Sequence, residues 1–285
     1  MSSRGGKSSG ALRRLELGPF VRFLIGVALV VVLLFPVYWL AVTATENTLT
    51  IFHTPPSLFP VHPSLTYFGQ VWGVQARHLL VSLVISCGTV ILSLLIAVPA
   101  GYALSQLEVR WTAAIVMVLL ITQMIPNVVL GVPYYLLFEK LHLLNTYEGL
   151  ILADSSYAVP FVIVVLRAFL VGFPKEMRES CLVDGAGELR TLVSVVIPLA
   201  APGVVTVALF SFLFAWSDFF FALTLTNSQT MQPMTLSLYL YLSSHLDEWN
   251  LAMASAVFAA IPSIILLVAA QRYIRSGLTL GAVKG

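Results

Sequence analysis

Six runs of apolar residues dominate the chain, and each is long enough to cross a membrane as a helix. A hydrocarbon core of about 30 Å requires about 20 helical residues. The runs occupy residues 20–42, 79–104, 113–138, 148–170, 195–225 and 251–273. This pattern predicts an all-α integral membrane protein with six transmembrane helices.

Prolines and one acidic residue interrupt these runs. Asp154 and Pro160 make the fourth run the least uniform, and the second, third and sixth runs also contain prolines. A proline is tolerated within a membrane where neighbouring helices satisfy the backbone groups that it frees. We therefore expect some spans to be broken or kinked. The other prolines concerned are Pro99, Pro126, Pro133 and Pro262.

The overall composition agrees with a membrane location. The chain is 59% hydrophobic and 10% charged, whereas a soluble domain is about 45 to 50% apolar and about 25% charged. The net charge of +2 argues against nucleic-acid binding. The two cysteines, Cys87 and Cys181, provide neither a disulfide framework nor the spacing of metal ligands. We therefore expect no metal site.

The positions of the cations predict the orientation. With the N-terminus inside the cell, only Arg77 and Lys140 of the fifteen Lys and Arg residues fall in outer segments. Short cytoplasmic segments of membrane proteins are rich in these residues. We therefore expect cytoplasmic N- and C-termini, with an N-terminal tail (1–19), a transmembrane domain (20–273) and a C-terminal tail (274–285). The outer segment 43–78 is rich in proline and aromatic residues, which favours a position on the outer face.

The most polar internal segment, residues 173–198, lies between the fourth and fifth spans on the predicted cytoplasmic side. Pro174 suits a first helical turn, and Gly185 allows a break with positive φ. Apolar residues then recur at helical spacing, which predicts one apolar face. Such a segment is suited either to docking into a cleft on another protein or to lying on the bilayer surface. The face consists of Leu189, Leu192, Val193 and Val196.

This segment resembles the EAA loop of binding-protein-dependent ABC importers, whose pattern is Glu-Ala-Ala, three residues, Gly, nine residues and Ile-x-Leu-Pro. Ser180 and Cys181 replace the two alanines and are also small. The resemblance implies a cytoplasmic coupling helix that contacts ATPase subunits. The residues that it implicates are Glu179, Ser180, Cys181, Asp184, Gly185, Ala186 and Pro198.

The resemblance extends over most of the chain and is specifically to the second permease of maltose-type carbohydrate importers. Residues 99–104 (PAGYAL), 143–146, 149–152 and the ending 277–285 carry it. In that group the C-terminal tail reaches the interface of the ATPase dimer. The residues implicated in this contact are Gly281, Lys284 and Gly285.

Polar residues within the predicted spans are candidates for the translocation path. An ionised Asp at the bilayer centre costs about 2.5 to 3.5 kcal/mol on insertion scales, so it requires partners or water. Trp216, Ser217 and Asp218 could line a path for a sugar, or they could form structural hydrogen bonds. Where the family usually has Trp-Asn and Asn-Ser, this chain has Trp216-Ser217 and Val81-Ser82. Contacts made by those asparagines elsewhere are therefore not expected here.

Three further polar residues have simpler interpretations. Gln123 and Asn127 are four residues apart and share one helical face, where they would pack helices together or line a polar seam. Asp154 is expected near the outer end of the fourth span, as a residue of the membrane interface.

The resemblance implies a permease subunit of an ATP-driven importer that moves a carbohydrate across the bacterial plasma membrane. It implies no catalytic site and no cofactor on this chain, with ATP and Mg on partner ATPase subunits. The other implied partners are a homologous second permease, an extracellular or periplasmic sugar-binding protein and membrane lipid. Three alternatives remain: a carrier or channel with Asp218 as its ion site, a membrane scaffold, and an importer permease for a non-sugar solute.

Overall fold

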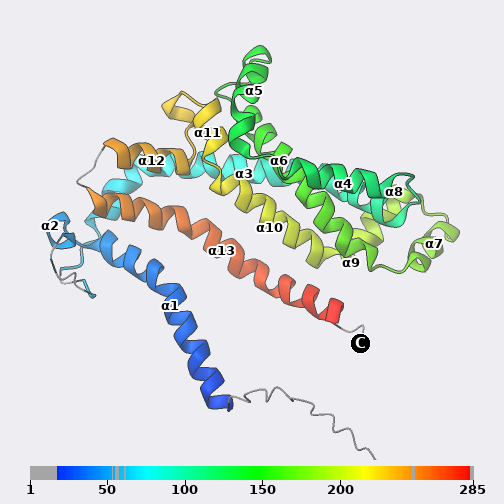
Figure 1. Cartoon of the computed structure of the whole chain (residues 1–285), viewed down its shortest axis with the longest axis horizontal. Helices are drawn as coiled ribbons and strands as arrows, with labels where there is room; N and C mark the ends of the chain where they lie inside the picture. The colour runs from blue at the N-terminus through cyan, green and yellow to red at the C-terminus, as the bar shows by residue number, and fades with distance from the viewer. Residues whose placement is uncertain (1–17, 53, 55–57, 61, 245–247, 283–285) are drawn as a thin grey trace, which may run out of the picture.

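The computed structural model describes residues 18–52, 54, 58–60, 62–244 and 248–282, with the backbone alone at 49, 244 and 274–282. Within these ranges every regular element is a helix. The predicted all-α architecture is therefore confirmed. The longest helices other than Pro19–Thr45 (α1) run roughly side by side between the end that holds Lys175–Val183 (α7) and the far end that holds Thr48–Ile51 (α2) and Met234–Ser244 (α12) (Figure 1).

Four helices are long and apolar enough to cross a membrane without interruption. They correspond to the first, second, fourth and sixth predicted spans. Their bounds are Pro19–Thr45 (α1), Thr66–Gln106 (α3), Tyr147–Val171 (α6) and Trp249–Ala282 (α13), of which the last is apolar enough up to Tyr273. Two bent pairs of helices bring the number of candidate spans to six if each pair is one span.

The third predicted span, residues 113–138, is divided into two helices, as its prolines led us to expect. Helix α4 (Thr112–Thr122) and helix α5 (Asn127–Lys140) meet at an angle of 93°. Pro126 precedes α5 with extended backbone, at φ −63° and ψ 133°. Because proline cannot donate a backbone hydrogen bond and disfavours helical geometry in the residue before it, the helix stops at this point.

The fifth predicted span, 195–225, is also divided. Its first residues belong to the stretch Glu188–Leu199, which lies at 84° to α10 (Ala201–Ser217). At its other end Asp218 has extended backbone, at φ −63° and ψ 130°, and a separate helix α11 (Phe220–Leu225) follows. The continuous span of the prediction is therefore a single helix of 17 residues with a break at each end.

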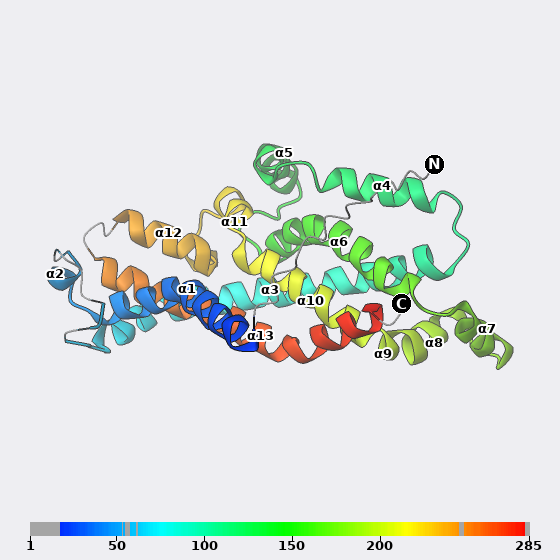
Figure 2. The same ribbon diagram turned by 60° about the horizontal axis from the view of Figure 1, so that its bottom comes forward.

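The remaining elements are short and lie at the two ends of the molecule. The far end carries α2, a 3-10 turn and α12, whereas α7, α8, a π-helical turn and α9 form the opposite end (Figures 1 and 2). Their bounds are Thr48–Ile51 (α2), Gln229–Met231 (3-10 turn), Met234–Ser244 (α12), Lys175–Val183 (α7), Glu188–Thr191 (α8), Leu192–Val196 (π turn) and Ile197–Leu199 (α9).

Helix α3 has 41 residues and is the central helix of the molecule. It packs against α6, α10, α12 and α13. Near its first third, the Ser82 hydroxyl accepts a hydrogen bond from the backbone N–H of Met234 (2.7 Å), and the Ser237 hydroxyl donates to the Gln75 side chain (2.8 Å). These bonds fasten α12 to α3.

Three apolar clusters form the core. The first joins α3 and α6 to residues 192–200 and lies toward the α7 end. The second contains Val81, the residue that stands where the resembled family has asparagine. The third joins α1, α3 and α13 through Ala44, Val71 and Ala254. Val81 is 2% exposed, so an amide at this position would be buried among apolar neighbours. The second cluster comprises Val81, Ile85, Phe138, Leu150, Ala153, Phe221 and Leu225.

The start of α6 requires a glycine. Thr146 caps the helix, and its hydroxyl accepts a hydrogen bond from the backbone N–H of Gly149 (3.0 Å). A Cβ atom at Gly149 would overlap the carbonyl oxygen of Leu143. The preceding residue Asn145 has φ 57°, and its side-chain oxygen accepts hydrogen bonds from the backbone N–H groups of Asn227 (2.8 Å) and Ser228 (3.0 Å). The turn before α6 thereby holds the segment after α11.

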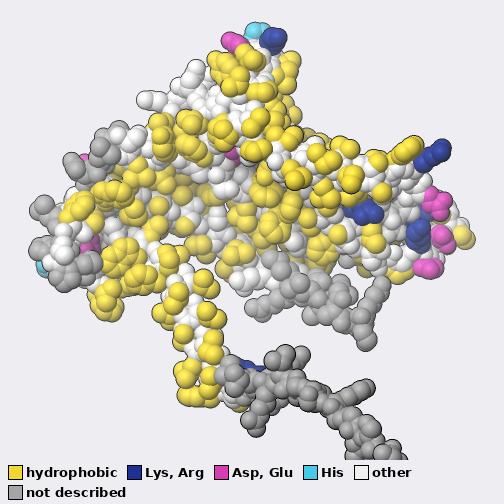
Figure 3. All heavy atoms as spheres, viewed as in Figure 1, with side chains coloured by type: hydrophobic (Ala, Val, Ile, Leu, Met, Phe, Trp, Pro, Cys, Tyr) yellow, Lys and Arg dark blue, Asp and Glu magenta, His cyan; other side chains and the backbone are white. Residues whose placement is uncertain are grey.

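Helix α1 extends away from the other helices for most of its length (Figure 1). It packs against α13 and α3, and its buried residues, Val42 and Ala44, lie near its end. The rest of the helix carries exposed apolar side chains, which appear as a yellow arm in Figure 3. This surface is available to lipid or to another membrane protein.

Candidate functional site

The EAA-like segment, residues 173–198, projects at one end of the molecule (Figures 1 and 2). Helix α7 begins after Pro174 and ends before Asp184, and Gly185 follows with φ 83°. The predicted helix and the predicted break with positive φ are both confirmed. Acidic and basic side chains gather at this end in the space-filling view (Figure 3).

An ion pair closes the turn between α7 and α8. The Arg178 guanidinium donates to both carboxylate oxygens of Glu188, and the Nε to Oε2 distance is 3.1 Å. The Tyr102 hydroxyl donates to the same Oε2 (2.7 Å) from helix α3. The Glu188 carboxylate raises the pKa of Arg178 above its ordinary value, chiefly through the hydrogen bond. These bonds therefore join α7 to α8 within the EAA-like segment and join the segment to α3.

Helices α3 and α6 are also bound to each other beside this segment. The Gln106 amide donates to the Leu170 carbonyl (2.6 Å), and Arg167 Nε donates to the Leu104 carbonyl (3.1 Å). Both carbonyls lie in the last turn of their helices, where intrahelical donors are absent, and the Leu170 carbonyl also accepts from the backbone N–H of Phe173 (3.1 Å). The segment is thus attached to a rigid pair of helices.

The predicted apolar face after Gly185 is only half correct. Leu192 and Val196 are buried, at 5% and 7% exposed, but Leu189 and Val193 are 74% and 55% exposed. Residues 192–196 form a π-helical turn, in which the N–H of Ile197 bonds to the carbonyl of Leu192. Leu192 and Val196 are four residues apart and both buried, whereas Leu189 and Val193, also four apart, are both exposed, so the four side chains lie on two faces and not on one.

The residues implicated by the EAA pattern form an exposed surface around Gly185. Glu179, Ser180, Asp184, Gly185 and Pro198 are exposed, whereas Cys181 and Ala186 are half-buried. Two apolar side chains on the same segment, Val183 and Leu189, are 87% and 74% exposed. Charged and apolar groups side by side on a projecting surface are suited to contact with another protein.

Replacing Glu188 by glutamine is expected to loosen this segment. The loss of one charge-assisted pair corresponds to about 1 kcal/mol, or about a fivefold change in the local opening equilibrium. Amide hydrogen exchange in α7 and α8 should therefore become about fivefold faster. Glu108→Gln, which removes an exposed carboxylate elsewhere, serves as the control. Equal exchange in both variants would contradict the role given to the ion pair.

Trp216, Ser217 and Asp218 do not face one common site. Trp216 is 7% exposed, stacks on Phe212 with ring centroids 5.3 Å apart, and donates from Nε1 to the Ala259 carbonyl of α13 (3.1 Å). Ser217 is exposed. Asp218 accepts hydrogen bonds from the backbone N–H groups of Phe221 (3.3 Å) and Ala222 (3.0 Å), and so caps α11. The hydrogen bond of Trp216 joins two helices within this chain.

Replacing Trp216 by phenylalanine is expected to lower stability. Phenylalanine retains the stacking on Phe212 but cannot donate to the Ala259 carbonyl, and one such bond is worth about 1 kcal/mol. The thermal unfolding midpoint should fall by about 2 to 4 °C. Ser217→Ala is the control, because the Ser217 hydroxyl bonds within its own helix, to Leu213 (2.7 Å). An unchanged midpoint for Trp216→Phe would show that the hydrogen bond from Trp216 does not contribute to stability.

Ser217 and Asp218 do line a cavity of about 300 Å³, together with residues of α5, α6, α10 and α11. Asp154, which we expect near the outer end of the fourth span, is 5% exposed and lines this cavity. α11 packs against α6, so Asp154 lies within the packed helices. The full lining is Asn127, Asp154, Tyr157, Phe214, Ser217, Asp218, Phe219, Phe220 and Phe221.

Gln123 and Asn127 have different roles, although their spacing places them on one face. Gln123 donates to the Tyr157 carbonyl (3.0 Å) and joins α6 to the end of α4, which confirms the packing role. Asn127 begins α5 beyond the bend and lines the cavity, where its side-chain oxygen is buried without a hydrogen-bond partner. The bend between α4 and α5 separates the two residues, and sequence spacing could not reveal it.

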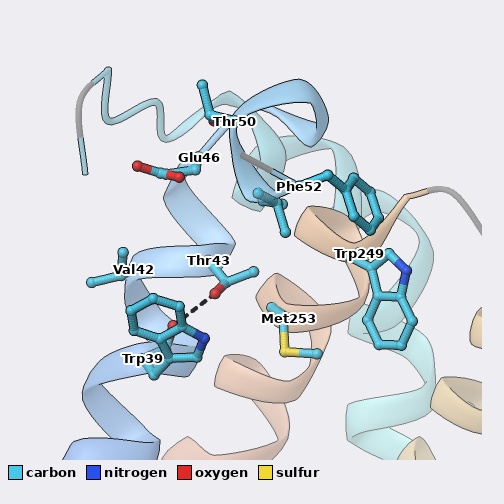
Figure 4. Close-up of a pocket in the computed structure, with 9 residues that line it drawn as sticks. Trp39, Val42, Thr43, Glu46, Thr50, Phe52, Trp249 and Met253 are labelled. Carbon is cyan, nitrogen blue, oxygen red and sulfur yellow. Dashed lines mark hydrogen bonds between the residues drawn. The ribbon is translucent and has the colours of Figure 1, made fainter. Parts of the chain in front are cut away.

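A second cavity of about 310 Å³ lies at the far end, between α1, α2 and α13. Figure 4 shows Trp39, Phe52 and Trp249 around it, with Glu46 at its rim. Aromatic rings of this kind favour the membrane interface. The cavity therefore indicates where the molecule leaves the hydrocarbon region.

The predicted C-terminal contact lies partly outside the described residues. Gly281 is in the last turn of α13, whereas Lys284 and Gly285 are not described. The backbone of α13 is helical through Ala282 and ends toward the α7 end in both views (Figures 1 and 2).

Comparisons with known proteins agree on one family. A model described as "Binding-protein-dependent transport system inner membrane component" matches residues 93–279. The chain is 32% identical to the sulfoquinovosyl glycerol transport system permease protein SmoH of Agrobacterium fabrum, over 94% of this chain and 95% of that one. It is 32% identical to the diacetylchitobiose uptake system permease protein DasC of Streptomyces coelicolor, over 91% and 95%.

A more distant relative and a solved structure extend this result. The trehalose/maltose transport system permease protein MalG of Thermococcus litoralis is 29% identical, over 91% of this chain and 94% of that one. A crystal structure of a bacterial ABC transporter involved in the import of the acidic polysaccharide alginate has a chain of the same fold. The TM-score is 0.75 at 21% identity, covering 90% of this chain and 95% of that chain.

Proposed function

Because the chain belongs to the family of inner membrane components of binding-protein-dependent transport systems, we propose that it is a permease subunit that imports a carbohydrate at the expense of ATP. The observation that carries the mechanism is the EAA-like segment, which projects from the helices and is fastened to α3 through Tyr102, Glu188 and Arg178. Family membership argues against the carrier, channel and scaffold alternatives.

The EAA-like segment is the contact with the ATPase subunits in this proposal. Its exposed charged residues and the exposed side chains of Val183 and Leu189 would enter a cleft on one ATPase subunit. ATP and Mg²⁺ would be held by those partners, and this chain would be non-catalytic. The backbone of α13 ends toward the same end, which supports a second contact through Gly281 and the residues after it.

Coupling then follows from the rigidity of this end. When the ATPase dimer closes, the segment would move as one body, since the ion pair prevents α7 and α8 from separating. The hydrogen bond from Tyr102 would transmit that movement to α3, and α6 would follow through the bonds from Gln106 and Arg167. The permease would thereby change from inward-facing to outward-facing, and hydrolysis would reset it.

The other partners follow from the remaining surfaces. The apolar side chains of α1 suit a homologous second permease, because the helix packs on this chain mainly against α13. A sugar-binding protein would deliver substrate at the far end, beside α2 and α12. The cations that fall between the spans support cytoplasmic termini and a bacterial inner membrane. Carbohydrate is the proposed cargo because SmoH, DasC and MalG are named for saccharides.

Affinity purification tests the assembly, and reconstitution tests the activity. A tagged chain should bring down a second permease and an ATPase. Proteoliposomes that contain this complex and its binding protein should take up sugar only with ATP inside. An ion gradient without ATP is the control condition. Purification as a lone homo-oligomer, or uptake driven by the ion gradient, would overturn the proposal.

A further inference from the structure

The cavity beside Asp154 lies where two helix breaks meet. One break separates α4 from α5 and ends at Pro126, and the other separates α10 from α11 at Asp218. α6 passes between them and contributes Asp154 and Tyr157. Interrupted membrane helices leave backbone and polar groups free near the middle of a membrane protein, where transporters bind their substrates.

Two hydrogen-bond acceptors in this cavity have no donor among the described residues. The Asp154 carboxylate is 5% exposed, and no hydrogen bond from the described residues reaches it. Asn127 Oδ1 is also buried without a partner. Asp218, which lines the same cavity, accepts from two backbone N–H groups. Buried acceptors of this kind require a donor from a ligand or from water.

The other side of the cavity is aromatic. Tyr157 and Phe214 meet edge to face with ring centroids 5.7 Å apart, and Phe219 and Phe220 complete the wall. Small-molecule sites combine such apolar walls with a few polar groups and have volumes of about 300 to 1,000 Å³. At about 300 Å³ the cavity has room for one sugar ring but not for an oligosaccharide.

These observations define the ligand by its chemistry. We propose that this cavity is a substrate site of the permease that binds one ring of a neutral, hydroxyl-rich saccharide and rejects acidic saccharides. The hydroxyl groups would donate to Asp154 and Asn127, and the carbon face of the ring would pack on Phe214. Among the residues that the structure describes, the lining contains no Lys, Arg or His, so a carboxylate or sulfonate on the sugar would lose its water without gaining a cation. This inference rests on the proposed function and names the substrate class within it.

Direct binding to the purified importer tests the site without the selectivity of the binding protein. The complex of both permeases and the ATPases is titrated separately with maltose, trehalose, diacetylchitobiose and an alginate disaccharide. At least one neutral probe should bind at least tenfold more tightly than the acidic one. Asp154→Asn should weaken that binding at least tenfold, because it replaces one acceptor oxygen by an NH2 donor.

Two further variants separate recognition from folding. Phe214→Leu should lower the affinity for the same probe several-fold, because it removes the flat ring and keeps an apolar residue. Glu148→Gln, an exposed carboxylate on the same helix, should bind within twofold of the wild type. Each variant must assemble and hydrolyse ATP as the wild type does, which establishes that it is folded.

Two sets of results would overturn the site. One is the absence of binding by all three neutral probes, and the other is equal binding of the alginate disaccharide or unchanged binding by Asp154→Asn. Either would leave assembly and ATP hydrolysis intact. Failure of the proposed function would appear differently, as a wild-type chain that captures no ATPase.

Discussion

Replacing Gly185 by valine is expected to abolish ATP-driven uptake, with a loss of at least tenfold, while the protein still inserts into the membrane. Gly185 has φ 83°, a conformation that a β-branched residue adopts only as an outlier. Forcing it costs about 1 to 3 kcal/mol, and relaxation would turn α7 away from α8. Uptake into proteoliposomes measures the loss, and membrane fractionation measures insertion.

Gly187→Val provides a matched control for that experiment. Gly187 is two residues further along the same exposed turn, but its backbone has φ −76° and ψ 164°, which suits valine well. A Cβ atom at either glycine would meet no other atom within 4 Å. Any difference between the variants therefore arises from backbone strain and not from crowding. Full uptake by Gly185→Val would contradict the coupling role of this segment.

Replacing Gly149 by alanine is expected to destabilise the whole chain. The added Cβ would overlap the Leu143 carbonyl, so the turn that caps α6 would have to move. That turn also holds Asn227 and Ser228 through the Asn145 side chain. We expect a cost on the order of 2 to 4 kcal/mol and a several-fold lower amount of protein in the membrane.

Gly69→Ala is the corresponding control. Gly69 lies inside α3, and a Cβ atom there would meet nothing within 4 Å. Alanine in a helix interior is favoured over glycine by about 0.5 to 1 kcal/mol. Its thermal midpoint should therefore equal or exceed that of the wild type, whereas that of Gly149→Ala should fall. A normal midpoint for Gly149→Ala would show that the turn adapts easily.

The sequence predicted the helices that depend on local pattern alone. Four spans are uninterrupted apolar runs, and each is found as one helix because length and hydropathy suffice to specify it. The two divided spans are equally apolar, so the pattern could not locate their breaks. Pro126 indicated one of them, but the 93° bend depends on which helices α5 packs against.

The EAA-like segment was predicted in outline but not in its connections. Gly185 could be recognised because only glycine fits readily at positive φ. The ion pair could not, because Arg178 and Glu188 are ten residues apart on different helices and their third partner, Tyr102, is on α3. The π turn at residues 192–196 was also missed, and so was the exposure of Leu189, which precedes it.

The cavity was the least predictable feature. Ser217 and Asp218 were candidates because polar residues are costly in a membrane. Asp154 was assigned to the interface from its position along the fourth run. Its burial depends on α11, which folds over α6 only because Asp218 ends α10 and caps a new helix. Residue order alone does not contain this information.

Helix α3 connects the two ends of the protein. Its 41 residues measure about 60 Å at about 1.5 Å per residue, roughly twice the thickness of the hydrocarbon core. Tyr102 near its last turn holds Glu188, and Gln75 and Ser82 in its first half hold α12. Gln75 and Tyr102 are about 40 Å apart along the helix, so a rotation of about 10° midway between them would displace each by about 3.5 Å. In the proposed orientation, a small rotation on the ATPase side would thus shift the surface that meets incoming cargo outside.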